Sequence, residues 1–206
     1  MCYSAEVSLG TFLFVTAICG YLWYRNRKVD RAVALMLFVI GFMQFLEYIL
    51  WTNQECNNIN KFITKIIPIY LFLQPIVVTL IVWQMKAGHG TLYFPLLMGY
   101  SLFLPYILTQ ITPTKPCIHK GNCEHLNWNL KLSLRDDTPI MHKLSIVFYQ
   151  LLMHYSALTL NNKYLGMFFA LSWASSNIIT ELMYKEVWAS VWCHAVNASA
   201  IAALVI

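Results

Sequence analysis

Apolar residues form long runs along almost the whole chain, and short polar connectors separate these runs. A helix needs about 20 predominantly apolar residues to cross a hydrocarbon core about 30 Å thick. The runs therefore predict an all-α, multi-pass membrane protein in which residues 1–206 form one seven-helix bundle. We expect the membrane-spanning helices at residues 8–24, 32–51, 66–85, 92–109, 143–160, 165–183 and 187–206.

One connector, at residues 110–142, is long enough to hold structure of its own. From Leu126 to Arg135, apolar and polar side chains alternate at every position. Alternation with a period of two is typical of a strand with one apolar face, so we expect a short strand or hairpin. Because a lone strand is unstable in water, two interpretations stay open. The strand is a lid on the helix ends or bilayer surface, or it is ordinary loop structure.

Composition agrees with a membrane protein. Of the 206 residues, 59% are hydrophobic and only 11% are charged, against about 25% charged in ordinary soluble domains. The net charge is +5, but the basic residues are scattered through the connectors and form no stripe interleaved with aromatic residues. We therefore expect contacts with lipid headgroups and no binding of nucleic acid.

Basic residues in the first connector predict the orientation of the chain. Arg25, Arg27, Lys28 and Arg31 lie there, and dense positive charge beside the first helix is normally retained in the cytoplasm. The amino terminus is then extracytoplasmic. The other connectors weaken this prediction, because more of the 14 lysines and arginines fall on the side that it places outside.

A carboxylate inside the second apolar run is the main functional signal. A charged side chain at membrane depth costs roughly 2.5–3.5 kcal/mol, so Glu47 is expected to face protein or water and to have a partner. Gln44, Glu47 and Trp51 are spaced by three and four residues, which places them on one face of a helix.

Topology brings other polar and aromatic residues to a similar depth. With seven spans, the amino terminus, the loop at 52–65 and the long connector share the side of the membrane nearest Glu47. The further candidates at or just below this level are Cys2, Glu6, Gln74, Glu181, Trp192, Cys193, His194 and Asn197.

Four interpretations of this polar level remain open. In the first, a metal-assisted membrane enzyme uses Glu47, Glu6 and His194 as catalytic groups. Carboxylate, thiolate and imidazole suit zinc or iron, and the candidate ligands are Cys2, Glu6, Glu47, Cys193 and His194.

In the second interpretation, the level is a pocket for a small molecule or lipid. Its candidate lining residues are Gln44, Trp51, Gln74, Glu181, Trp192 and Asn197. In the third, the carboxylates form the proton or cation relay of a transporter or channel. In the fourth, the polar groups only hold the helices together, as in a structural membrane component.

Cysteine and histidine residues also cluster in the long connector. Cys117, His119, Cys123 and His125 resemble a zinc ligand set, although their spacing is not a standard one. On an oxidising face of the membrane a disulfide is the simpler prediction. We expect Cys117 to pair with Cys123 or, as the alternative, with Cys56.

The opening Met1-Cys2-Tyr3-Ser4-Ala5-Glu6-Val7-Ser8 resembles that of an uncharacterised family of multi-pass membrane proteins from bacteria and large DNA viruses. Members of that family begin Met-Cys-Phe-Ser-x-Glu-x-Ser, so Tyr3 departs from the pattern. Ser190-Val191-Trp192-Cys193 and the spacing from Glu47 to Trp51 are also similar. The resemblance implies a membrane bundle over the whole chain and supplies no activity, cofactor or catalytic residue. The Asn-, Ile- and Lys-rich loop at 53–65 suits an AT-rich genome, which hints at a viral source.

Overall fold

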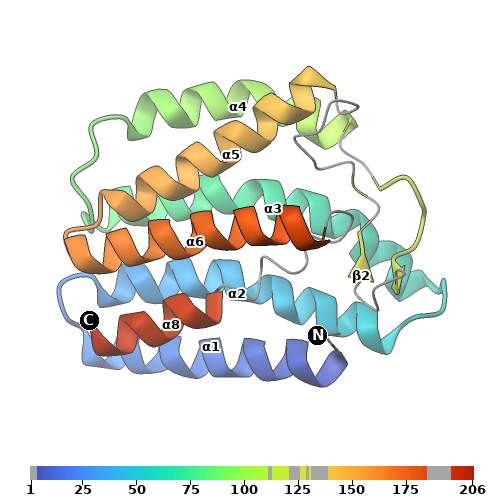
Figure 1. The fold of residues 1–206 in the computed structure, drawn as a ribbon, viewed down its shortest axis with the longest axis horizontal. Helices are drawn as coiled ribbons and strands as arrows, with labels where there is room; N and C mark the ends of the chain where they lie inside the picture. Colours follow the sequence, from blue (N-terminus) through green and yellow to red (C-terminus); the bar gives the residue numbers. More distant parts are fainter. Residues whose placement is uncertain (1–3, 111–112, 121–125, 129, 131–138, 185–195) are drawn as a thin grey trace.

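A computed structural model of the chain describes residues 4–110, 113–120, 126–128, 130, 139–184 and 196–206. Seven helices and one pair of short strands form from these residues (Figure 1), so the all-α prediction is confirmed. The helices are α1 (Ala5–Arg25), α2 (Asp30–Thr52), α3 (Asn58–Gln84), α4 (Tyr93–Gln110), α5 (Ile140–Leu158), α6 (Lys163–Tyr184) and α8 (Val196–Val205). The strands are β1 (His119–Lys120) and β2 (Leu126–Asn127).

Among the described residues, three helices are both long and apolar enough to cross a membrane, namely α1, α2 and α3. This finding supports an integral membrane protein. All the long helices run along the same axis of the molecule in Figure 1. α1 begins at one end of the bundle, and α8 ends at the other, beside the turn between α1 and α2.

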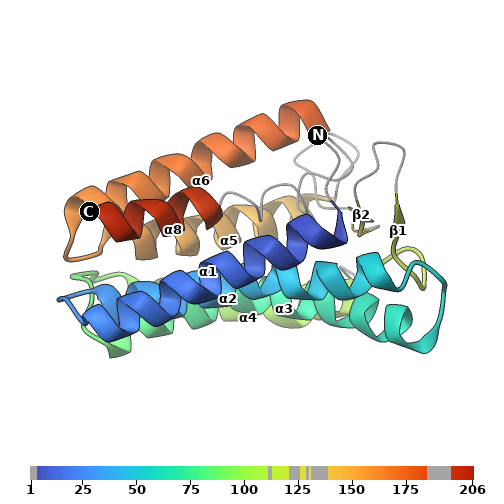
Figure 2. The same cartoon turned by 90° about the horizontal axis from the view of Figure 1, so that it is seen from below.

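Helix α2, which carries Glu47, is surrounded by three other helices. It packs against α1, α3 and α8, and Figure 2 shows α8 lying between the α1–α2 pair and α6. Close approach of α1 and α2 depends on Gly41, because a Cβ atom added there would lie 2.9 Å from Val15 Cγ1. Phe12 packs beside Phe45 one turn away, with ring centroids 5.1 Å apart.

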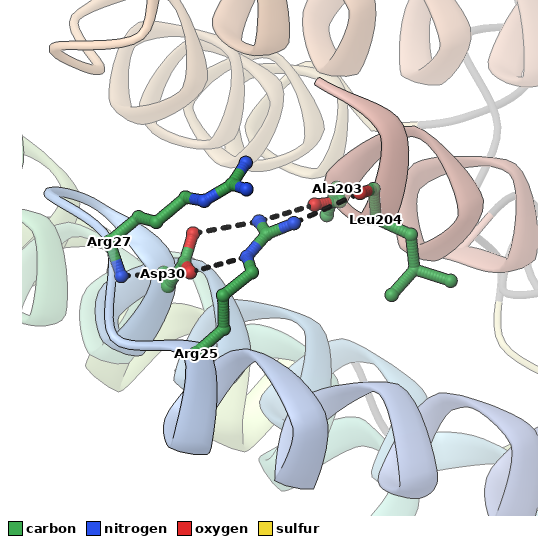
Figure 3. A network of polar contacts seen from close by, with 5 residues as sticks. All are labelled: Arg25, Arg27, Asp30, Ala203 and Leu204. Carbon is green, nitrogen blue, oxygen red and sulfur yellow. Dashed lines mark hydrogen bonds and ion pairs between the residues drawn. The ribbon is translucent and has the colours of Figure 1, made fainter.

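The turn between α1 and α2 is fixed by an ion pair that also holds the last helix. Arg25 donates from Nε to Asp30 Oδ2 at 2.7 Å and from Nη2 to Asp30 Oδ1 at 2.9 Å. The same guanidinium donates to the carbonyl oxygens of Ala203 and Leu204, each at 2.9 Å (Figure 3). Since these carbonyls lie in the last turn of α8, Arg25 acts as a C-cap for that helix.

Helix α3 begins eight residues earlier than the predicted start at residue 66. The Asn57 side chain accepts the Asn60 N–H at 2.9 Å and so caps the helix. This polar first turn has the composition of a loop, but it provides the capping chemistry that starts a helix. Pro68 and Pro75 lie inside α3, which continues through both.

The long connector is anchored to the first turn of α3 by a buried asparagine, Asn60. Asn60 Nδ2 donates to the Ile118 carbonyl at 2.8 Å, and Asn60 Oδ1 accepts the Ile118 N–H at 3.0 Å. Thr64 and Asn53 complete this network. The segment around Ile118 is therefore fixed against the ends of α2 and α3.

The predicted strand or hairpin in the connector exists in a small form. β1 and β2 pair antiparallel, with His119 opposite Asn127 and Lys120 opposite Leu126. Leu126 and Trp128 are buried in the hydrophobic core, as the lid interpretation of the alternating pattern requires. The predicted strand continued to Arg135, but residues 129 and 131–135 lie outside the described residues.

Candidate buried polar site

Two polar side chains of α2 are almost completely excluded from solvent. Gln44 is 0% exposed and Glu47 is 1% exposed, so the prediction that this polar face is buried holds. They are one turn apart on a helix whose surrounding residues are apolar. Such groups are expected to be hydrogen-bonded, because a buried polar atom without a partner carries the full cost of desolvation.

Gln44 does not meet this expectation. Neither its Nε2 nor its Oε1 atom has a hydrogen-bond partner among the described residues. Glu47 itself is engaged by an interaction within the protein, so the orphaned atoms belong to its neighbour. The Gln44 amide thus has an unpaired donor and an unpaired acceptor within the part of the chain that the structure describes.

Helix α1 contributes polar residues at the same depth. Its buried stripe begins with Ser8 and Thr11 and continues with apolar residues every third or fourth position. The antiparallel contacts of Phe12 with Phe45 and of Val15 with Gly41 set the register between α1 and α2. By this register, Ser8 lies level with Glu47 and Thr11 lies level with Gln44.

Helix α8 completes the group. Asn197 Nδ2 donates to Thr11 Oγ1 at 3.2 Å, while Asn197 Oδ1 and Ser8 Oγ are buried without a hydrogen-bond partner in the described part of the chain. We refer to Ser8, Thr11, Gln44, Glu47 and Asn197 as the buried polar cluster. It offers a carboxylate, three orphaned oxygen atoms and one orphaned amide nitrogen within about two helical turns.

Gln74 belongs to a different network. Its Oε1 accepts the Tyr149 hydroxyl at 3.0 Å, and its Nε2 donates to the Val39 carbonyl at 3.2 Å. Tyr70 donates to the same carbonyl at 2.6 Å. Val39 lies two turns deeper than Glu47, so Gln74 is a satisfied residue that joins α2, α3 and α5. The prediction that it lies deeper than Glu47 agrees with this contact, but its assignment to one pocket with Glu47 does not.

Trp51 marks the end of the polar face of α2. The Lys120 ammonium lies over its ring, 5.7 Å from the ring centroid. The Lys120 backbone N–H also donates to Gln54 Oε1 at 3.0 Å. The β1 strand thus covers the end of α2 that leads to Glu47.

The cysteines of the capped end form a disulfide, but the partner differs from the first prediction. Cys117 is bonded to Cys56 across 61 residues, so the Cys117–Cys123 pairing is wrong and the alternative with Cys56 is correct. Asn60 explains this outcome, because its bonds to Ile118 place the neighbouring Cys117 beside the start of α3. His119 lies in the same group, and its ligand atom is within 4.8 Å of both sulfurs.

Glu6 is exposed to solvent, whereas Glu47 is buried. Glu6 lies in the first turn of α1, where its carboxylate accepts the Ser4 hydroxyl. An exposed carboxylate does not share a dry site with a buried one, so the prediction of a common catalytic or metal site for Glu6 and Glu47 is not supported. The side chain of Glu181 and all of Cys2, Cys123, Trp192, Cys193 and His194 lie outside the described residues.

A cavity at the capped end is distinct from the buried polar cluster. It has a volume of about 370 Å³ and lies between α3, α4 and the connector. The described residues that line it include Lys65, Ile107 and Lys115, and none belongs to α2.

No family model, curated protein or solved structure matches this chain. The chemistry of the buried residues is therefore the basis for a functional proposal.

Proposed function

We propose that this chain is a multi-pass membrane protein that binds a small, positively charged polar ligand in the buried polar cluster. The observation that carries the proposal is Gln44, which is fully buried beside Glu47 and whose two amide atoms have no hydrogen-bond partner among the described residues. Orphaned buried groups are rare in proteins and are normally satisfied by water, an ion or a ligand.

The donor set favours a positive charge on the ligand. Glu47 provides a carboxylate, and Ser8, Gln44 and Asn197 provide neutral oxygen atoms. Hard cations and ammonium groups take oxygen ligands of this kind. The Gln44 Nε2 donor would serve an acceptor atom on a polar organic ligand.

Ligand-dependent thermal unfolding of the purified protein tests this proposal. Alkali and alkaline-earth cations and small primary amines are added one at a time to protein in neutral detergent. At least one class is expected to raise the Tm of the native protein. Glu47→Gln should abolish this increase, because it removes the charge while preserving the shape of the side chain.

Glu6→Gln is the matched control. It removes an equal charge from an exposed position of α1 and should leave the ligand response unchanged. Equal loss in both variants would point to a general charge effect and contradict the site. Bound zinc or iron that disappears in Glu47→Gln would instead support the metal-assisted enzyme.

We further infer that the seven helices all span the membrane, with the amino terminus extracytoplasmic. The long helices α4, α5 and α6 have 18, 19 and 22 residues, which is close to the length that a crossing needs. The Cys56–Cys117 disulfide lies at the end where α1 begins, and disulfides persist on oxidising faces. The basic connector from Arg25 to Arg31 lies at the opposite end.

Labelling of single introduced cysteines tests this orientation. A membrane-impermeant maleimide applied to intact cells should modify Lys61→Cys, which lies at the capped end. It should not modify Arg27→Cys until the membrane is permeabilised. Modification of Arg27→Cys in intact cells would reverse the orientation.

A further inference from the structure

A second polar site lies at the opposite end of the bundle from Glu47. It is a cavity of about 440 Å³ between the α1–α2 turn and the start of α6. Arg27, Lys28, Lys163 and Tyr164 are among the residues that line it. The ligand site proposed above at the buried polar cluster uses none of these residues.

The cavity carries an excess of positive charge. Its lining includes four basic side chains and one acidic side chain, Asp30. Asp30 is already bound by the Arg25 guanidinium and by the Arg27 backbone N–H at 2.9 Å. Arg25–Asp30 is the one ion pair among the described residues, so Arg27, Lys28 and Lys163 form no ion pair within the described part of the chain.

A helix terminus adds to this positive potential. Helix α6 begins at Lys163, and Asn162 caps it by accepting the Leu165 N–H at 3.2 Å. The first-turn N–H groups of a helix carry a partial positive charge and favour phosphate groups. The amino end of α6 and the three basic side chains therefore all add positive potential to the same cavity.

The walls of the cavity are held in place before any ligand arrives. On one side, Asp30 fixes the α1–α2 turn, and Asn26 ends α1 in the left-handed conformation at φ 50°. On the other side, Asn161 donates from its backbone N–H to the Ala87 carbonyl at 2.8 Å and from Nδ2 to the Lys86 carbonyl at 3.0 Å. A preorganised site loses less free energy on ordering when it binds.

The exposed side chains near this cavity are of the kinds found at the level of lipid headgroups. Exposed aromatic residues gather at the same end of the helices, at Tyr21, Trp23, Tyr24 and Tyr164. Tyrosine and tryptophan are enriched at membrane interfaces, and basic pockets between membrane helices bind anionic headgroups. We propose that this cavity binds the phosphate group of an anionic phospholipid.

Titration with short-chain lipids tests the proposal on the full chain. Dioctanoyl phosphatidylglycerol is added to protein in neutral detergent, and binding is followed by the increase in Tm and by native mass spectrometry. Dioctanoyl phosphatidylcholine is the zwitterionic comparison and should bind much more weakly. The triple variant Arg27→Gln, Lys28→Gln, Lys163→Gln should weaken phosphatidylglycerol binding about 100-fold, at about fivefold for each basic residue.

A second triple variant controls for net charge. Lys61→Gln, Lys65→Gln, Lys115→Gln removes the same charge at the opposite end and should leave the affinity within about twofold. Equal weakening by both variants, or equal binding of the two lipids, would overturn the proposal. Competition by inorganic phosphate at the same concentration as the lipid would also overturn it, because the ligand would then be a soluble phosphate. All six substituted residues are exposed, so both variants should keep the native Tm without lipid.

Discussion

At the scale of single residues, Gln44 and Gln74 form a natural comparison. They are the same residue type, each at most 1% exposed, on neighbouring helices. Gln74 has a bonded donor and a bonded acceptor, whereas Gln44 has neither among the described residues. We therefore expect the hydrogen bonds of Gln74 to stabilise the bundle, and we expect no such contribution from the Gln44 amide.

Gln44→Leu should leave the free energy of unfolding unchanged or raise it, because it removes a buried amide that lacks partners. Gln74→Leu should lower it by about 1–3 kcal/mol, because the Tyr149 hydroxyl and the Val39 carbonyl lose a partner. Denaturant unfolding of both variants in the absence of ligand measures this difference. Equal destabilisation by the two variants would show that Gln44 is satisfied within the protein.

The sequence predicted some residues of the buried polar cluster and missed others, and each outcome has a physical reason. A polar residue within an apolar run must be buried or paired, and Gln44 and Glu47 are buried. Hydropathy does not tell which side of a helix faces the bundle near its end, so the sequence placed exposed Glu6 together with buried Glu47. Ser8 was overlooked, although its spacing from Thr11 and Val15 places all three on one face of α1.

At the scale of elements, small residues decide how closely helices approach. At Gly166 of α6, an added Cβ would meet the backbone carbonyl oxygen of Ala157 on α5, closer than real Cβ atoms come. A backbone atom cannot move aside as a flexible side chain does. At Gly20 of α1, an added Cβ would meet nothing within 4 Å.

Gly166→Ala should therefore lower the free energy of unfolding by about 1–3 kcal/mol, since α5 and α6 must move apart. Gly20→Ala should be neutral or stabilising by up to about 1 kcal/mol, because alanine is the better helix former. Thermal unfolding of both variants in the same detergent gives the comparison. A stable Gly166→Ala protein would mean that α5 and α6 tolerate a wider separation.

Within the described residues, the order of the helices followed from the apolar runs, whereas their ends did not. Helix α3 starts at Asn58 because Asn57 and Asn60 supply a cap and a connector anchor, and neither role is visible in hydropathy. The disulfide partner of Cys117 was also decided by Asn60 and could not be read from hydropathy. We expected Cys117 to pair with Cys123, but the Asn60 network brings Cys117 to Cys56.

At the scale of the whole molecule, the two ends of the bundle differ in chemistry. One end carries the Cys56–Cys117 disulfide and the β1–β2 pair, and the other carries the Arg25–Asp30 ion pair and the basic cavity. The capped end is held covalently, while the basic end is held by hydrogen bonds to α8. One end of the bundle is therefore oxidised and covered by the connector, and the other end carries the basic cavity.

Alkylation without reductant, followed by digestion and mass spectrometry, should yield a peptide pair linked through Cys56 and Cys117. Reduction should lower the free energy of unfolding by about 2–4 kcal/mol, as is typical for a disulfide. It should also increase protease cleavage between residues 113 and 120.

Cys19 is buried and free in the structure, and it provides the control, because its alkylation should require unfolding. A linked Cys117–Cys123 peptide would contradict the pairing.

The Arg25 guanidinium binds carbonyl oxygens that the ribosome produces 178 and 179 residues later. At about 5–20 residues per second, that interval is on the order of ten seconds or more. During it, α1 and α2 are already made, and Asp30 is available to Arg25 within the same turn. The Arg25–Asp30 pair can therefore form before α8 exists, and only the late arrival of residues 203 and 204 gives the guanidinium its full set of acceptors.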